Sequence, residues 1–233
     1  MYVFSLPYFL STRGRTRLEE AIASYDNALK FKPDKDEAWY NRGIALFNLG
    51  RLEEAIASYD NALKIKPDYH EAWNNRGIAL GNLGRLEEAI ASFDEALKIK
   101  PDDPETLHYR ELALAYLELE KQINTYDQLL NSNPNDHEIW ETKASFLYLL
   151  GRYEEAILSC NKSLEILPNN ANSYFNKACI YSLQENIDLA IDHLKQAINL
   201  DCKYLEEAKT DTDFDKIRHD SRFINLIHQS DSP

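Results

Sequence analysis

Pairs of adjacent glutamates are the feature of this 233-residue chain most suggestive of chemistry, because two neighbouring carboxylates can serve as a general acid and a general base. They occur as Glu53–Glu54, Glu87–Glu88 and Glu154–Glu155. Each pair, however, opens a helical pattern, where carboxylates offset the positive end of the helix dipole. An active site would be unique, whereas these pairs recur with the period of a repeat. We therefore interpret them as helix-start residues.

The histidines, glycines and cysteines give no stronger sign of chemistry. No two histidines stand four residues apart, and none joins a cysteine at the spacing of metal ligands. Gly77, Gly81 and Gly84 look like a phosphate-binding loop, but they lie within a helical pattern rather than between a strand and a helix. Cys160 and Cys179 occupy repeat positions on predicted helices, so we expect them to be packing residues. The sequence thus predicts no catalytic residue, no metal, no cofactor and no enzymatic activity.

Composition and charge restrict the class of partner and the compartment. The formal net charge of -13 opposes binding to nucleic acid or to anionic membranes, and it favours a neutral or basic protein partner. Three cysteines, an odd number, suit a reducing compartment, so we expect a cytoplasmic protein. No apolar run approaches the roughly 18 residues that span a bilayer. Residues 1–10 are apolar but follow no positive charge and contain Pro7, so we expect neither a signal peptide nor a membrane anchor.

Self-comparison of the sequence reveals a repeat of 34 residues. Residues 36–69 and 70–103 are identical at 28 of 34 positions without a gap. The other copies, which are weaker or partial, occupy 17–35, 104–136, 137–170 and 171–204. Each full copy predicts two helices, with a residue such as Gly50 between them and one such as Pro67 after the second. Since neither helix can bury its apolar stripe alone, the copies must stack on one another.

The residues at fixed places in the repeat resemble those of the tetratricopeptide repeat family. In the first full copy Arg42 replaces the family's usual leucine, and the matching residues are Trp39, Gly43, Leu46, Ala55, Tyr59, Ala62 and Pro67. The resemblance covers about residues 17–204. It implies an all-α superhelical solenoid of antiparallel helix pairs, in which the first helices line a concave groove that receives protein segments.

Three parts of the chain depart from the regular repeat. Copy 104–136 is one residue short near Glu118, lacks the glycine between its helices and has bulky residues where alanine is usual, so we expect a bend in the array there. Residues 1–16 show no recognisable first-helix pattern and form a divergent N-terminal segment. Residues 205–233 carry apolar residues on a charged background, which predicts helices that cap the last apolar face.

The face of each first helix opposite its buried stripe is expected to line the groove. Copies 36–69 and 70–103 differ within their first helices, after the opening residue, only at Tyr40/Asn74 and Phe47/Gly81, which lie on this face. A constant scaffold with variable face residues indicates locally specialised contacts; chance divergence is the alternative explanation. The predicted groove residues are aromatic, aliphatic and polar side chains suited to peptide recognition: Tyr40, Ile44, Phe47, Asn48, Asn74, Ile78, Asn82, His108, Leu112, Tyr116, Tyr148 and Phe175.

Four first helices carry a glutamate as their second residue, at the predicted edge of the groove: Glu37, Glu71, Glu105 and Glu138. A solvated edge is the simplest explanation, but four carboxylates in register would also favour a basic ligand. Some members of the family bind the acidic C-termini of heat-shock chaperones through lysine and arginine residues spaced four apart. The first helices here lack such a pair, so this specific function is disfavoured.

The sequence therefore favours a non-catalytic scaffold or adaptor that binds a peptide or protein segment in its concave groove. Two alternatives stay open. Self-assembly through the incomplete N-terminal repeat would give a homo-oligomer. A regulatory array would instead serve an enzyme that is a separate chain.

Overall fold

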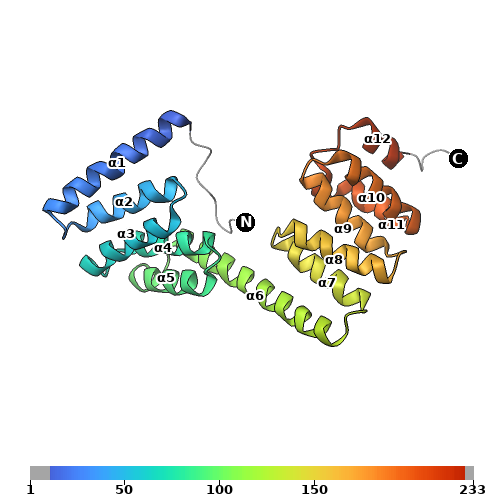
Figure 1. Cartoon of the computed structure of the whole chain (residues 1–233), viewed down its shortest axis with the longest axis horizontal. Helices are drawn as coiled ribbons and strands as arrows, with labels where there is room; N and C mark the ends of the chain where they lie inside the picture. The colour runs from blue at the N-terminus through green and yellow to red at the C-terminus, as the bar shows by residue number, and fades with distance from the viewer. Residues whose placement is uncertain (1–10, 229–233) are drawn as a thin grey trace. The chain divides into compact units, whose positions relative to one another are not determined.

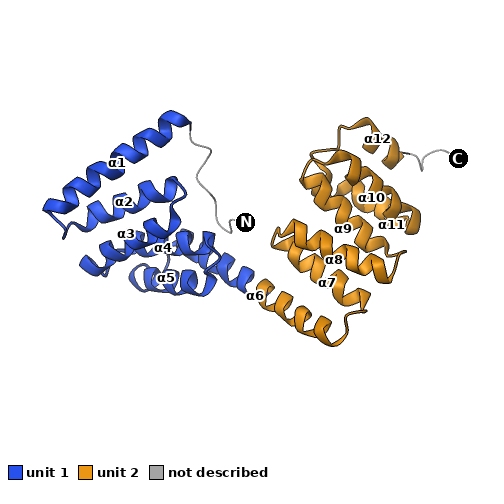
Figure 2. Cartoon of the chain, viewed as in Figure 1, with its two compact units in different colours: residues 1–118 blue, residues 119–233 orange. Residues whose placement is uncertain are grey.

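The computed structural model describes residues 11–228 and is all α-helical in this range apart from one short 3-10 helix, as predicted (Figure 1). Most of the divergent segment predicted at 1–16 lies outside the described residues. The chain divides into two compact units, unit 1 with residues 1–118 and unit 2 with residues 119–233 (Figure 2).

Unit 1 is built from helix pairs. Within its described residues, its helices are α1 Thr12–Phe31, α2 Asp36–Asn48, α3 Leu52–Ile65, α4 His70–Asn82, α5 Leu86–Ile99 and the first part of α6 Pro104–Ser132. Helix α2 packs on α3, and α4 packs on α5, as two antiparallel hairpins (Figure 1). These hairpins are the two near-identical copies of the repeat.

A glycine in the left-handed conformation ends the first helix of each hairpin. The φ angles of Gly50 and Gly84 are 76° and 75°, values that other residues adopt only with strain. After Gly50, the N–H of Arg51 donates to the carbonyl of Leu46 at 2.9 Å, which satisfies the end of α2. Gly151 in unit 2, with φ of 65°, has the same role. The glycine therefore sets the reversal that makes a hairpin.

A tryptophan on the first helix of both hairpins holds the loop that precedes it. The indole Nε1 of Trp39 donates to the carbonyl of Pro33 at 2.9 Å, and that of Trp73 donates to Pro67 at 2.9 Å. The same bond recurs in unit 2. The tryptophan and proline of the repeat thus form one contact, which explains their fixed spacing.

Copy 104–136 does not form the expected hairpin. One continuous helix, α6, runs from Pro104 to Ser132 where the sequence predicted two helices. The stretch from Tyr116 to Lys121 consists of residues that favour a helix or tolerate one, and it contains no glycine that would reverse the chain. The local sequence therefore allows the helix to continue. The bend expected in this copy remains a prediction.

Unit 2 contains two hairpins and a closing segment. After the end of α6, its described elements are α7 His137–Leu149, α8 Tyr153–Ile166, α9 Ala171–Leu183, α10 Ile187–Leu200, α11 Lys203–Thr210, the 3-10 helix η1 Thr212–Phe214 and α12 Ser221–His228. The turn between α9 and α10 uses Glu185 with φ of 60° in place of glycine. Helices form in the segment predicted to cap the array, and residues 229–233 lie outside the described range.

In four copies a basic residue of the first helix pairs with an aspartate sixteen residues earlier. The guanidinium of Arg42 donates to Asp26 at 2.7 Å, and that of Arg76 donates to Asp60 at 2.6 Å. The same pairing recurs further along the chain at Arg110 and at Lys143. The unusual arginine of the repeat therefore ties each first helix to the second helix of the preceding copy.

The first helix of the last copy has a lysine at this position, but no aspartate lies sixteen residues earlier. Lys177 on α9 is only 8% exposed, and the residue sixteen places earlier is Asn161. Burial lowers the pKa of Lys177 because an ammonium is poorly solvated there. Unit 2 thus contains a buried lysine without the aspartate that pairs with the basic residue in the other copies.

Replacing Asn161 by aspartate is expected to restore the missing pair. The variant should gain about 1 kcal/mol in free energy of unfolding at pH 7, because a paired buried lysine is favoured over an unpaired one. The lowered pKa makes the unfolded chain bind more protons, so wild-type stability should rise with pH between that pKa and about 10.4, and the variant should lose this slope. Urea unfolding at pH 7 measures the gain in stability, and the same measurement in a pH series up to about 10.4 measures the slope.

The matched control is Asn124→Asp, the same charge change on the exposed face of α6. An Asn161→Asp variant no more stable than this control would contradict the pairing.

Candidate peptide-binding groove

The predicted groove face of α2 is half-exposed. Tyr40, Ile44 and Phe47 rest on the core of unit 1 with part of each side chain in solvent. The ring of Tyr40 lies 4.8 Å from that of Tyr69, and its hydroxyl accepts a hydrogen bond from Nδ2 of Asn75 at 3.0 Å. The hydroxyl proton of Tyr40 therefore remains available to a ligand. Asn48 at the end of the same face is also half-buried.

The corresponding face of α4 is not open. Asn74, Ile78 and Asn82 are all buried, so this part of the predicted face is largely covered. The reason is the next first helix: the hydroxyl of Thr106 on α6 donates to the side-chain carbonyl of Asn74 at 3.1 Å, and Ile78 belongs to the apolar core shared with α6. These residues hold neighbouring copies together.

The groove face of α6 within unit 1 is open again. His108 is exposed, and Leu112 and Tyr116 are half-buried beside the core. The ring of His108 lies 5.6 Å from that of Tyr109, which stacks in turn on Phe93. The accessible residues of unit 1 are therefore aromatic and aliphatic, the types that give area to a bound segment.

In unit 2 the chain itself covers the predicted groove residues. The ring of Phe175 lies 4.6 Å from Tyr204 and 5.8 Å from Phe214, and it is 7% exposed. The hydroxyl of Tyr148 donates to the carboxylate of Asp213. Both residues are thus occupied by the segment after α10, and the prediction that Phe175 is accessible is wrong.

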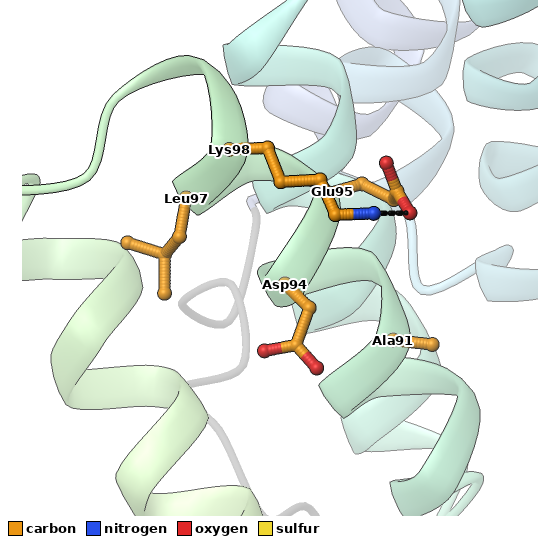
Figure 3. Close-up of a pocket in the computed structure, with 5 residues that line it drawn as sticks. All are labelled: Ala91, Asp94, Glu95, Leu97 and Lys98. Carbon is orange, nitrogen blue, oxygen red and sulfur yellow. Dashed lines mark hydrogen bonds and ion pairs between the residues drawn. The ribbon is translucent and has the colours of Figure 1, made fainter.

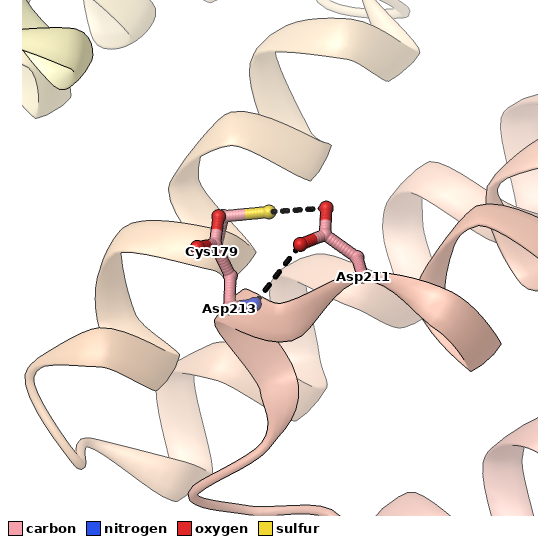
Figure 4. Close-up of side chains that lie close together, drawn as sticks. All are labelled: Cys179, Asp211 and Asp213. Carbon is pink, nitrogen blue, oxygen red and sulfur yellow. Dashed lines mark hydrogen bonds between the residues drawn. The ribbon is translucent and has the colours of Figure 1, made fainter.

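The same closing segment gathers Cys179, Asp211 and Asp213 (Figure 4). Within residues 11–228 this is the one cluster whose ligand atoms are close enough to hold a metal. Each carboxylate has a structural partner, because Asp211 accepts from the N–H of Asp213 at 2.9 Å and Asp213 accepts from Tyr148. The two aspartates therefore have structural roles at the start of η1, and we assign no metal to the cluster.

Neither buried cysteine is a nucleophile at neutral pH. Burial raises the pKa of Cys160 to about 12. Burial and the charges of Asp211 and Asp213 raise the pKa of Cys179. Both thiols therefore stay protonated, and both pack in the apolar interior, as the repeat register predicts.

The glutamates at the second place of the first helices are all exposed: Glu37, Glu71, Glu105 and Glu138. They are not equivalent, since the carboxylate of Glu71 accepts a hydrogen bond from the ammonium of Lys100 at 2.9 Å. That pair lowers the pKa of Glu71.

A cavity of about 190 Å³ opens beside this pair, lined by Tyr40, His70, Glu71, Asn74, Asn75, Lys100, Asp103 and Glu105. Sequence reasoning named four of these residues as groove residues and missed the other four, His70, Asn75, Lys100 and Asp103. Lys100 and Asp103 lie at the end of the second helix and in the loop that follows it. The sequence did show that Lys100 and Asp103 come just before the first helix of the next copy, and this position could have indicated them. A separate hollow lies on the second helix α5, where Lys98 donates to Glu95 at 2.6 Å (Figure 3), away from the first-helix face.

Family models cover the regular parts of the chain. Tetratricopeptide repeat models match residues 36–69, 70–103 and 136–203, and a TPR repeat model matches residues 15–50. The chain belongs to the tetratricopeptide repeat family. The stretch between the matches, residues 104–135, is the copy that forms the continuous helix α6.

Relatives of this tetratricopeptide repeat protein are distant. The BBSome complex member BBS4 homolog of Drosophila melanogaster is 29% identical over 83 residues, which are 36% of this chain and only 17% of that protein. Among solved structures, YrrB, described as a TPR protein with an unusual peptide-binding site, is 22% identical, with a TM-score of 0.39 over 79% of this chain and 97% of that chain. The first TPR of Spaghetti (RPAP3), bound to the HSP90 peptide SRMEEVD, is 25% identical, with a TM-score of 0.43 over 45% of this chain and 82% of that chain.

Tetratricopeptide repeats are protein-binding modules, and proteins of the family are typically non-catalytic scaffolds. None of the helices within residues 11–228 combines the length and apolar character needed to cross a bilayer.

Proposed function

We propose that this chain is a non-catalytic scaffold that binds an extended protein segment on the first-helix face of unit 1. The observation that carries the proposal is the way unit 2 uses its own face. There, residues 211–214 lie against α9: Phe214 meets Phe175, and the hydroxyl of Ser182 donates to the carbonyl of Asp213 at 2.7 Å. A first-helix face of this chain thus accepts a polypeptide segment through a ring contact and a main-chain hydrogen bond.

Unit 1 offers similar groups to a partner. The half-exposed rings of Tyr40, Phe47 and Tyr116 supply apolar area, and the hydroxyl of Tyr40 supplies a donor. The exposed carboxylates at the edge favour a neutral or basic segment over an acidic one. Recognition of this kind needs no cofactor.

Removing the ring of Phe47 is expected to weaken binding without unfolding the chain. The second copy has Gly81 at the matching place, so the fold tolerates a small residue there. A random peptide library displayed on phage and selected against the full chain provides ligands. Phe47→Ala should lower the affinity of an enriched peptide about tenfold in fluorescence anisotropy, the loss expected when one anchoring ring is removed.

The control variant is Leu158→Ala, because Leu158 is 63% exposed on the second helix α8 and should leave affinity unchanged. Circular dichroism checks the fold of both variants. Equal affinities for both variants, a Phe47→Ala chain that loses its helicity, or a library that yields no ligand would each count against the groove.

A further inference from the structure

The cavity beside Tyr40 has room for more than water. Its volume of about 190 Å³ is several times the roughly 30 Å³ that one water molecule occupies in the liquid. It lies wholly within unit 1, between the start of α4, the start of α6 and the side chain of Tyr40 on α2. A side chain of a segment bound along the first helices could enter it beside Tyr40.

His70, which lines the cavity, has a buried ring nitrogen without a hydrogen-bond partner. The hydroxyl of Thr106 has one proton, which goes to Asp103 at 2.7 Å or to Asn74 at 3.1 Å. Nε2 of His70 lies 3.4 Å from the same hydroxyl oxygen, and it bonds to that oxygen as a donor when the hydroxyl proton goes to Asp103 or Asn74. Nδ1 of the same ring has no hydrogen-bond partner although His70 is only 5% exposed.

The charges at the rim are mainly negative. Glu71, Asp103 and Glu105 face one cation, Lys100, which is paired with Glu71. Asp103 already accepts from the N–H and hydroxyl of Thr106, at 3.0 and 2.7 Å. Glu105 has no ion-pair partner among residues 11–228 and is exposed at the rim. Burial, and then the charge of Glu71, raises the pKa of Tyr40, so negative charge reaches its hydroxyl.

We propose that this cavity is a pocket for the guanidinium group of an arginine side chain in the bound segment. The proposal rests on the proposed function, because it assigns one side chain of the peptide that unit 1 would bind. Glu105 is the principal ion-pair partner of the arginine. The side-chain carbonyl of Asn75 accepts a further N–H group, and the ring of Tyr40 lies alongside the guanidinium plane.

Arginine fits these groups better than other charged side chains. A guanidinium has five donor hydrogens and no acceptor, which matches a wall of acceptors. Its planar shape also suits contact with an aromatic ring and a bidentate bond to one carboxylate. An anion would meet three carboxylates. The ammonium of a lysine has three donors and lacks the planar face, so it uses the pocket less fully.

The first experiment tests arginine within a peptide selected against the full chain. Enriched peptides should contain arginine, and replacing it by citrulline, which is nearly the same shape but uncharged, should weaken binding tenfold or more. Glu105→Gln should cause a similar loss with the arginine peptide and little further loss with the citrulline peptide. The matched control is Glu87→Gln, the same charge change on exposed Glu87 of α5, and it should change affinity less than twofold.

The second experiment needs no selected peptide. N-acetyl-arginine amide, titrated into the ¹⁵N-labelled full chain, should shift the amide signals of residues 70–75 and 103–106. N-acetyl-lysine amide should shift them less, and Glu105→Gln should reduce the arginine effect.

The outcomes separate the pocket from the groove. Peptides that bind without arginine, or that keep their affinity with citrulline, overturn the pocket and leave the proposed function standing. A library that yields no ligand counts against the proposed function, and the pocket then stands or falls with the arginine titration. Equal shifts for the arginine and lysine probes overturn the preference for a guanidinium.

Discussion

Replacing Gly77 by alanine is expected to lower the free energy of unfolding by about 2 kcal/mol, the size typical of an overpacked core. In an ordinary helix interior, replacing glycine by alanine raises the free energy of unfolding by about 1 kcal/mol. We therefore expect the opposite effect at Gly77. The reason is contact: a Cβ at Gly77 would lie 2.5 Å from Cε1 of Phe93. That ring is fully buried and cannot move without displacing its neighbours. Gly43 and Tyr59, also 2.5 Å apart by this measure, should behave in the same way.

The chain itself suggests the compensating change. Where Gly77 faces Phe93, the last copy has Ala178 with Leu194 sixteen residues later, and both are fully buried. Phe93→Leu alone should destabilise by about 1 kcal/mol because it leaves a small cavity. Added to Gly77→Ala, however, Phe93→Leu should recover stability, since the smaller side chain makes room for the methyl group.

Urea unfolding of the two single variants and the double variant gives the coupling energy. Additive losses, or a stabilised Gly77→Ala, would show that helix propensity rather than the ring contact decides the outcome at this place.

The register of the hairpins could be predicted from the sequence because each fixed residue has a local task. Trp39 needs the carbonyl of Pro33, and Gly50 needs a left-handed φ, so their spacing specifies where helices begin and end. The small residues at fixed places, such as Gly43, are then required by the close contact between the two helices of a copy. Such local requirements can be read from a single copy and checked against the next.

The continuous helix α6 shows where this reasoning fails. The missing glycine near Glu118 was visible, but a missing glycine alone does not decide between a turn and a helix. Glu185 makes the turn between α9 and α10 with φ of 60°, whereas the residues around Glu118 continue the helix. The outcome depends on how each copy packs on its neighbours, which the local sequence does not encode.

The candidate site was predicted in part for a similar reason. Tyr40 and Phe47 lie on a half-exposed face of α2, and the 3.6-residue period of a helix is enough to place them opposite its buried stripe. The burial of Asn74 depends on Thr106 of the next copy, and that of Phe175 depends on Phe214, about forty residues away. Contacts between copies, and the path of the chain after the last copy, decide which face residues remain accessible.

Phe214→Ala is expected to cost about 3–5 kcal/mol, the range for truncating a buried phenylalanine. Its ring is fully buried, stacks on Phe223 at 5.5 Å and meets Phe175 at 5.8 Å, so its removal leaves a cavity among aromatic rings. Hydrogen exchange followed by mass spectrometry should show lost protection in α9 to α12. Protection in α2 to α5 should persist, because these hairpins have their own core.

The control for this variant is Ile224→Ala, since Ile224 belongs to the same closing segment but is 40% exposed and should cost less than about 1 kcal/mol. The comparison also bears on function. If Phe214→Ala costs no more than Ile224→Ala, the closing segment contributes little to unit 2 and can leave α9 easily. Phe175 and Tyr148 would then be accessible to a partner, and unit 2 would have a binding face of its own. A large, local loss instead means that residues 211–214 are a fixed part of unit 2, which leaves the first-helix face of unit 1 for a partner.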